Sequence, residues 1–327
     1  MPAPRDMFFE SVVRPEHNGW FLVDSLCTRF TYHSREEWMA KVSLGLVTVN
    51  GVVAGVESIA HRGDKVVYHV ENYSEPEVPT DFDTLYEDDE FMLVAKPAGV
   101  PVLHTGHIFY NTFTAIVRRA IHSETATPLH RLDRDTGGIM LFAKDGDTAA
   151  RFQRHLDRIL LKKFYLAVVP GIFPEGVTEC ELPLREDPTS ELRIKMFHSE
   201  NGKPCHTRFR RLDLVSVEKT EENPSGFVSI VEAELLTGRK HQMRAHLSTL
   251  GFPILGDRLY SHEGKYYLKL ASGNVLTEEE YKILGAKNQM LYAYRVQILL
   301  PYWNEPREFT SLNFPKEMKA LIPKELL

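Results

Sequence analysis

Residues 130–144 read HRLDRDTGGIMLFAK, and this stretch is the most informative in the chain. Its apolar part, residues 139–143, predicts a buried strand, and the charged part before it predicts the loop that leads into that strand. Charged side chains beside a core strand cost free energy unless they are paired or used chemically. The loop is therefore where we first expect a functional site.

The loop carries two carboxylates between arginines. If the loop is extended, Arg131, Asp133 and Asp135 share one face, because strand side chains repeat every two residues. One of the carboxylates could then act as a nucleophile or a general base. The alternative is a turn in which both aspartates cap backbone groups and the arginines lie in water. The loop alone leaves both interpretations open.

A second polar segment, residues 237–246, reads TGRKHQMRAH. It places Arg239, His241, Gln242 and Arg244 around the start of a predicted helix, whose N-terminal end attracts anions. The five-residue spacing of its two histidines does not suit two metal ligands on one helical face, and there is no HExxH pattern, so we expect no metal. The chain also lacks the glycine-rich patterns of dinucleotide and P-loop sites and the GxSxG pattern, so we expect no cofactor.

The composition limits the class of protein. At 327 residues the chain is long enough for about two domains, and its 43% hydrophobic and 26% charged residues are typical of an ordinary soluble protein. No apolar stretch approaches the roughly 18 residues of a membrane span, and the first residues lack the pattern of a secretory signal. Cys27, Cys180 and Cys205 are far apart and form no CxxC pair, so we expect small apolar side chains in a reducing cytoplasm.

The net charge of −6 does not indicate a nucleic-acid binder, but a local basic groove matters more for RNA than the total charge. Lysines and arginines do cluster locally. The clusters are Arg118 with Arg119, Arg131 with Arg134, Lys162 with Lys163, Arg208 with Arg210 and Arg211, and Arg239 with Lys240 and Arg244. Taken alone, each cluster is more simply explained as a solvated surface.

The pattern along the chain predicts several parts. We expect an N-terminal arm at 1–20, a compact unit at 21–75, a linker with prolines and acidic residues at 76–84, and a larger domain at 85–327. In the compact unit, Ser34 and Glu37 form a capping-box pattern before a helix, and Asn50-Gly51 predicts a hairpin turn. The larger domain has predicted strands at 91–95, 139–143, 164–169 and 227–236, and predicted helices at 147–161 and 240–250. Strands outnumber helices without regular alternation, so the class is α+β.

Together these segments resemble the RluA family of RNA pseudouridine synthases. Residues 130–144 resemble that family's HRLD-x-x-TSG motif and its following strand, residues 163–168 (KFYLAV) resemble its K-x-Y-x-A-x-V strand, and residues 236–260 resemble its TGR-x-HQ-[IL]-R-x-H signature. Weaker landmarks are residues 96–99 (KPAG) and the residues around 202–207. The resemblance spans about residues 85–316. It implies an α+β fold with a mixed, largely antiparallel central sheet flanked by helices.

The resemblance also implies an activity, the isomerisation of uridine to pseudouridine within RNA, with no cofactor. Asp133 matches the family's catalytic aspartate, Arg244 the arginine that pairs with it, and Tyr165 the aromatic residue that stacks on the target base. Arg131 matches the arginine that inserts where the base leaves the stack. Further expected RNA contacts are Arg134, Arg239, His241, Gln242 and Met243. Attack on C1′ and removal of the C2′ proton both need an ionised Asp133, and the two roles stay open.

Two residues depart from the family pattern. Gly137 stands where the family usually has serine, and we expect the glycine to loosen the loop after Asp133. Met243 replaces the usual isoleucine or leucine, a change of similar volume that a core tolerates. We assign Asp135 a structural role as a cap within the loop.

Residues 21–75 resemble an S4 RNA-binding domain of small α/β fold, most clearly at residues 45–51 (GLVTVNG). Because basic and acidic residues are nearly balanced there, a purely structural role is the alternative. We expect structured RNA, ribosomal or transfer RNA, as the partner, and a cytoplasmic monomer that does not bind membranes. The competing functions are a non-catalytic RNA-binding or ribosome-assembly factor that retains the fold, and a glycosidase that uses Asp133 and Asp135.

Overall fold

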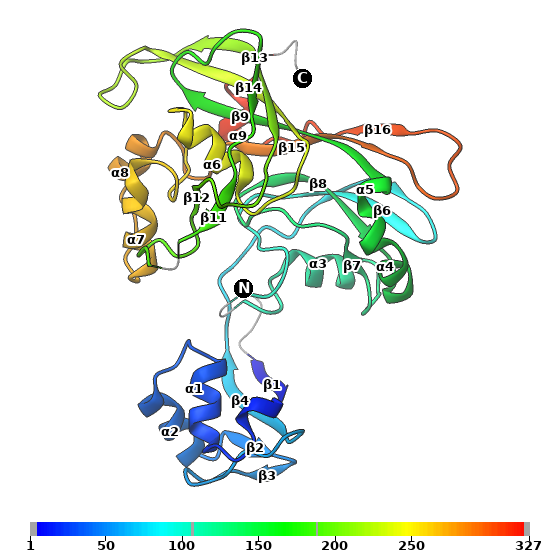
Figure 1. Cartoon of the computed structure of the whole chain (residues 1–327), viewed down its shortest axis with the longest axis vertical. Helices are drawn as coiled ribbons and strands as arrows, with labels where there is room; N and C mark the ends of the chain where they lie inside the picture. Colours follow the sequence, from blue (N-terminus) through cyan, green and yellow to red (C-terminus); the bar gives the residue numbers. More distant parts are fainter. Residues whose placement is uncertain (1–4, 106–107, 188, 324–327) are drawn as a thin grey trace. The chain divides into compact units, whose positions relative to one another are not determined.

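The computed structural model describes residues 5–105, 108–187 and 189–323. The chain divides into two compact units, one up to Glu77, to which Ile108 also belongs, and one that contains the remaining residues from Val78 (Figure 1). No helix in the described ranges is long and apolar enough to cross a membrane.

The first unit combines two helices with one small sheet. Its elements are β1 (Arg5–Val12), a 3-10 turn at Pro15–His17, α1 (Leu22–Arg29), α2 (Arg35–Ser43), β2 (Val47–Val49), β3 (Val52–Val53) and β4 (Lys65–Tyr73). The strands form an antiparallel sheet in the order β1-β4-β2-β3. The predicted capping box of Ser34 and Glu37 is confirmed at the start of α2, and the Asn50-Gly51 turn joins β2 to β3. The core centres on Trp38, which is fully buried.

The prediction of an N-terminal arm is wrong for the described part of residues 1–20. Strand β1 pairs continuously with β4 from Phe8, opposite His69, to Val12, opposite Lys65. The sequence hid this strand because Phe8 and Val12 face outward, 61% and 53% exposed, while the inner face carries Ser11. An edge strand with apolar residues on its outer face lacks the alternation that reveals most strands.

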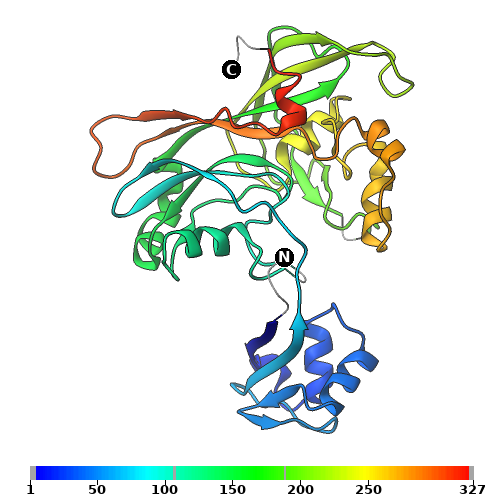
Figure 2. The same ribbon diagram turned by 180° about the vertical axis from the view of Figure 1, so that it is seen from behind.

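The second unit is built on a ten-stranded sheet. Its strands are β5 (Asp83–Glu87), β6 (Phe91–Lys96), β7 (Thr127–Pro128), β8 (Gly137–Ala143), β9 (Leu160–Pro170), β10 (Val177–Cys180), β13 (Thr207–Ser216), β14 (Phe227–Leu235), β15 (Leu291–Ile298) and β16 (Arg307–Thr310). The order is β10-β13-β14-β9-β15-β8-β6-β5, with β16 beside β15 and β7 beside β8. The hairpin of β15 and β16 projects from the sheet in both views (Figure 1; Figure 2). The pairing of β15 with β8 is parallel and the other recorded pairings are antiparallel, which confirms a mixed, largely antiparallel sheet.

The helices and a small extra sheet complete the described part of this unit. They are α3 (Phe113–Ala120), α4 (Gly146–Phe152), α5 (Leu156–Ile159), α6 (Gln242–Thr249), α7 (Lys265–Ala271), α8 (Glu278–Leu284), α9 (Lys316–Lys319), the 3-10 turns at Gln153–His155 and His262–Gly264, and the pair β11 (Leu184–Glu186) and β12 (Met196–His198). Strand β8 is buried on both faces. Its Met140 and Phe142 join one core with residues of α3 and α6, while Ile139 and Leu141 join a second core with residues of α4 and α5. Helices therefore flank both faces of the sheet.

The predicted helix at 147–161 is confirmed as a helical segment, but it is interrupted and ends two residues early. The segment forms α4, a 3-10 turn and the single turn of α5, and Leu160 already belongs to β9, where it pairs with Ile298. The predicted apolar positions Phe152, Leu156 and Ile159 do pack against the second core. The strand pairing of Leu160 overrides the helical periodicity that continues through it.

Two glycines open β8, and both are needed for the close approach of β15. A Cβ on Gly138, whose φ is 115°, would lie 2.2 Å from the carbonyl oxygen of Ala293. A Cβ on Gly137 would lie 3.0 Å from the ring of Tyr292 and 3.2 Å from the carbonyl oxygen of Lys96. Position 137 is tightly packed, which corrects the expectation that glycine loosens the loop there.

Candidate active site

A pocket of about 410 Å³ opens where the loop before β8 meets the start of α6. Its charged lining residues are Arg131, Asp133, Lys163, Arg239, Lys240 and Arg244, so five Lys and Arg side chains surround one carboxylate. Tyr165, His241, Gln242 and Met243 also line it. The pocket thus gathers residues from the two polar segments and from β9.

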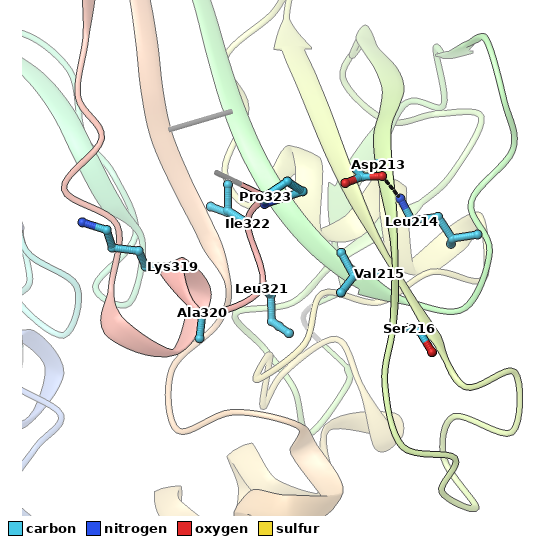
Figure 3. A pocket seen from close by; sticks show the side chains of 9 residues that line it. All are labelled: Asp213, Leu214, Val215, Ser216, Lys319, Ala320, Leu321, Ile322 and Pro323. Atoms are coloured by element: carbon cyan, nitrogen blue, oxygen red, sulfur yellow. Dashed lines mark hydrogen bonds between the residues drawn. The ribbon is translucent and has the colours of Figure 1, made fainter. Parts of the chain in front are cut away.

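A second hollow of about 740 Å³ lies between β13 and residues 319–323 (Figure 3). Its lining is mainly apolar, and its ionisable residues Asp213 and Lys319 lie on opposite sides of it. The Asp213 carboxylate accepts a hydrogen bond from the backbone N–H of Leu214 at 2.8 Å. Since its described lining does not bring ionisable groups together, the pocket beside β8 is the candidate active site.

The loop that carries Asp133 is held through its backbone. Lys96, buried at the end of β6, donates to the carbonyl oxygens of Pro97 (2.9 Å), Val100 (2.8 Å) and Arg134 (3.0 Å). Three acceptors match the three N–H donors of a lysine ammonium group. The backbone N–H of Gly99 donates to the same Arg134 oxygen at 2.9 Å. Lys96 therefore fixes the backbone directly after Asp133.

Arg244 joins Asp133 to a second, fully buried aspartate. Its Nη1 donates to Asp133 Oδ2 at 2.8 Å, and its Nε and Nη2 donate to the two carboxylate oxygens of Asp257 at 2.6 and 2.9 Å. Asp257 also accepts the backbone N–H groups of Leu259 and Tyr260, both at 3.0 Å. A bidentate pair of this kind fixes the orientation of a guanidinium group as well as its position. Asp257 thus directs Arg244 at Asp133.

The electrostatics of the pocket keep Asp133 ionised. Burial is the largest single influence and disfavours the charged form, but the charge and hydrogen bond of Arg244 together with the other basic side chains nearby outweigh it, so the pKa of Asp133 lies below its ordinary value of 3.8. The Asp133 side chain remains 22% exposed, compared with 10% for Arg244. A carboxylate is therefore available to a ligand in the pocket at neutral pH.

His241 lies directly before α6 and adopts a φ of 54°, in the left-handed region that is uncommon for residues other than glycine. Its Nδ1 is 3.2 Å from the hydroxyl of Tyr260, and its Nε2 is 3.7 Å from Asp133 Oδ1. Burial lowers the pKa of His241 to about 4, so the ring is neutral at pH 7. The Tyr260 oxygen already accepts the N–H of Met196 at 2.8 Å and can donate its own proton to Nδ1, which leaves Nε2–H facing Asp133.

Tyr165 and Met243 lie in the same pocket as Asp133, as the predicted site requires. Tyr165 is 5% exposed, and burial, then the charge of Asp133, raises the pKa of its hydroxyl, which is therefore neutral. Gln242 also lines the pocket and is buried. Its amide bonds Thr237 Oγ1, Arg239 N, His206 O and Thr207 Oγ1, all within 3.0 Å. These four bonds inside the protein brace the segments around Gln242.

Only some of the remaining charged residues of the two polar segments lie at the pocket. Arg131 and Arg239 are exposed and line the pocket, whereas Arg134 is outside the described lining and donates to the Gly99 carbonyl oxygen at 3.2 Å. Asp135 accepts from Arg258 at 3.2 Å, so it anchors the loop by an ion pair and not by the predicted backbone cap. The two aspartates of the loop are therefore not equivalent.

Three contributors to the site were not assigned roles from the sequence: Lys96, Asp257 and Tyr260. Lys96 lies in the KPAG landmark, and Asp257 and Tyr260 lie within residues 236–260, so the only signal was their place in stretches that resemble the family. Within the described residues, no group of three or more His, Cys, Asp or Glu is arranged to hold a metal ion.

Comparison with known proteins places the chain in a family. A family model described as RNA pseudouridylate synthase matches residues 90–249. An uncharacterized RNA pseudouridine synthase of Synechocystis sp. is 30% identical over 244 residues, which cover 74% of this chain and 80% of the relative. The mitochondrial tRNA pseudouridine(32) synthase of Saccharomyces cerevisiae is 32% identical over 254 residues, which cover 77% of this chain and 53% of the relative.

Solved structures show the same fold. The structure of human RNA pseudouridylate synthase domain containing 1 aligns with a TM-score of 0.56 and 23% identity, over 76% of this chain and 90% of that chain. The relatives found by sequence define a class of isomerases that act on RNA. The chain belongs to the family of RNA pseudouridine synthases.

Proposed function

We propose that this protein converts uridine to pseudouridine within structured RNA, with Asp133 as the catalytic residue. The observation that carries the proposal is the ionised Asp133, held at 2.8 Å by Arg244 in a pocket that also contains Tyr165. The overall reaction is an isomerisation. The bond between C1′ and N1 breaks, the uracil turns, C5 bonds to C1′, and the C5 proton is lost while N1 gains one.

The residues of the pocket divide this work. Asp133 either attacks C1′ or removes the C2′ proton, and either role uses a carboxylate that is ionised before the substrate arrives. Tyr165 stacks on the uracil, and its neutral hydroxyl adds no charge beside Asp133. Flipping the base out of the RNA stack costs a few kcal/mol. Arg131, which is exposed and lines the pocket, fills the space that the flipped base leaves. Arg239, His241 and Met243 contact the RNA around the target nucleotide.

The remaining assignments belong to the same proposal. The resemblance at residues 45–51 and the helix pair with its antiparallel sheet support assigning the first unit as an S4-like domain, and we assign the residues from about 85 onward as the catalytic domain. Two yeast relatives are named as tRNA pseudouridine synthases for positions 31 and 32, which favours transfer RNA over ribosomal RNA as the substrate. The protein acts as a monomer in the cytoplasm.

The experiment uses RNA that carries tritium at uracil C5, because pseudouridine formation releases this label. Asp133→Asn should abolish release while the circular dichroism spectrum stays that of the wild type. Asp135→Asn is the matched control, because Asp135 pairs with Arg258 outside the pocket lining and its loss should leave most of the activity. Release of tritium by the Asp133 variant at the wild-type rate would contradict the assignment of Asp133 as the catalytic residue. Binding and rescue by that variant in cells lacking the gene would favour the non-catalytic factor.

A further inference from the structure

A basic segment lies next to the pocket and takes no part in the proposed chemistry. Residues 151–163 contain five Lys and Arg but one Asp and no Glu, in a chain whose net charge is −6. Phe152 and Leu156 pack against the second core, and Ile159 is buried in it. The fold therefore turns the apolar face of this segment inward. It leaves Arg154, Arg158 and Lys162 exposed.

These exposed cations lack the carboxylate partners that other basic side chains of the sheet have. Ion pairs recorded among the described residues include Arg151 with Glu90, but none for Arg154, Arg158, Lys162 or Lys163. On β13, by contrast, Arg208 is 2.7 Å from both Glu179 and Glu234, and Arg210 is 2.9 Å from Glu232. A cation already paired with a carboxylate gains little from a phosphate, whereas an unpaired one keeps its full charge for it.

The segment is continuous with the pocket. Leu156 and Lys163 line the pocket, so one wall of it is built from the same stretch of chain. The ammonium group of Lys163 lies 3.8 Å from where a Cβ on Gly238 would be, which shows that Lys163 reaches across to the segment before α6. Arg158 and Lys162 are therefore within a few residues of the pocket lining along the chain, although Lys162 points to the other face of β9 from Lys163.

The first unit contains both paired and unpaired cations. Of its described cations, Arg35 lies 2.9 Å from Asp24, Lys65 2.8 Å from Glu10, and Arg14 3.8 Å from Glu16. Arg29 donates to the Val12 carbonyl oxygen and Lys41 lies over the Tyr68 ring, and neither makes an ion pair with a described carboxylate. The pocket, by comparison, holds Asp133 as the one carboxylate in its described lining.

We propose that Arg154, Arg158 and Lys162, named here the basic strip, bind the phosphates of the RNA strand that flanks the target uridine. Because the segment that carries the strip also lines the pocket, the strip supplies more of the electrostatic affinity for RNA than the first unit does. The inference rests on the proposed function for its choice of RNA as the ligand. Contacts of this kind position the strand and do not read its sequence.

The test measures the binding of bulk transfer RNA to the full-length protein over a range of salt concentrations. The variant Arg154→Gln/Arg158→Gln/Lys162→Gln leaves the pocket lining intact. The affinity for RNA falls as salt rises, so the slope of log affinity against log salt is negative. Three lost contacts to a single strand should make this slope shallower by about 2 and weaken binding roughly 100-fold at about 0.1 M salt. The matched variant Arg35→Gln/Arg62→Gln/Lys65→Gln removes the same number of exposed charges from the first unit and should change the slope by less than about 0.5.

Unchanged affinity and slope in the basic-strip variant would overturn the inference. A larger loss of affinity in the first-unit variant, or no binding of RNA by the wild type at low salt, would also overturn it. Circular dichroism shows whether each variant is folded, and single substitutions replace any triple variant that is not. The proposed function fails separately, if wild-type protein releases no tritium from RNA, because binding is measured without turnover.

Discussion

Replacing Gly137 by serine tests how much the tight packing at the start of β8 contributes to stability. A Cβ at this position would meet two ring carbons of Tyr292 at 3.0 Å and the carbonyl oxygen of Lys96 at 3.2 Å. The ring cannot easily move, because its hydroxyl is 2.8 Å from Ser311 Oγ and it packs against the tilted ring of Phe314, with centroids 4.9 Å apart. Overpacking of this kind costs about 1–3 kcal/mol in the free energy of unfolding.

Differential scanning calorimetry measures this cost for the transition of the second unit. A loss of that size corresponds to a fall of about 3–10 °C in Tm for a domain of this length. Gly146→Ala is the matched control, because the nearest atom to its Cβ is the Thr125 Cβ at 3.8 Å. The control should be neutral or stabilising by about 0.4–1 kcal/mol. A serine at position 137 that leaves Tm unchanged would show that Tyr292 does not hold β8 and β15 together.

Three further predictions concern the charges around Asp133. Asp257→Asn removes a buried carboxylate from Arg244 and places an N–H₂ group opposite one of the arginine's N–H donors. Chemical denaturation should show a loss of about 3–5 kcal/mol in the free energy of unfolding. An unchanged denaturation midpoint would contradict the positioning role of Asp257. Because the pKa of Asp133 is lowered, its pairing with Arg244 stabilises the fold above about pH 4, and this contribution is lost as the pH falls through the lowered pKa. Tritium release at saturating RNA should accordingly be flat from about pH 5.5 to 8, and an acid limb near about pH 6 would mean that Asp133 is not held ionised. His241→Gln keeps a hydrogen-bond donor near the Nε2 position and should retain most of the catalytic rate. His241→Phe removes the donor and should lower kcat about tenfold with little change in KM. Equal rates for the two variants would exclude a donor role for His241.

The central strands could be predicted because their sequences leave few alternatives. Residues 139–143 form an unbroken apolar run, and the structure buries both faces of β8, as such runs require. The edge strand β1 was missed because its outer face carries Phe8 and Val12. The end of the 147–161 helix was misplaced because the pairing of Leu160 with Ile298 is a long-range contact that local periodicity does not contain.

The site shows the same division between local and distant information. The sequence of the loop left Asp133 and Asp135 equivalent, and the resemblance distinguished them. The structure distinguishes them physically, because Arg244 contacts one and Arg258 the other. Asp257 had no signal of its own, since a single aspartate becomes a positioning group only when folding buries it against an arginine.

Because 111 residues separate Asp133 from Arg244, the ribosome makes Asp133 well before its partner. At about 5–20 residues per second, roughly 5–20 s pass between the synthesis of the two side chains. Strand β8 can pair with β6 during that interval, but its other neighbour, β15, is made later still. The ion pair that lowers the pKa of Asp133 therefore forms only after α6 has been made and has docked. On the proposed function, activity depends on this late contact.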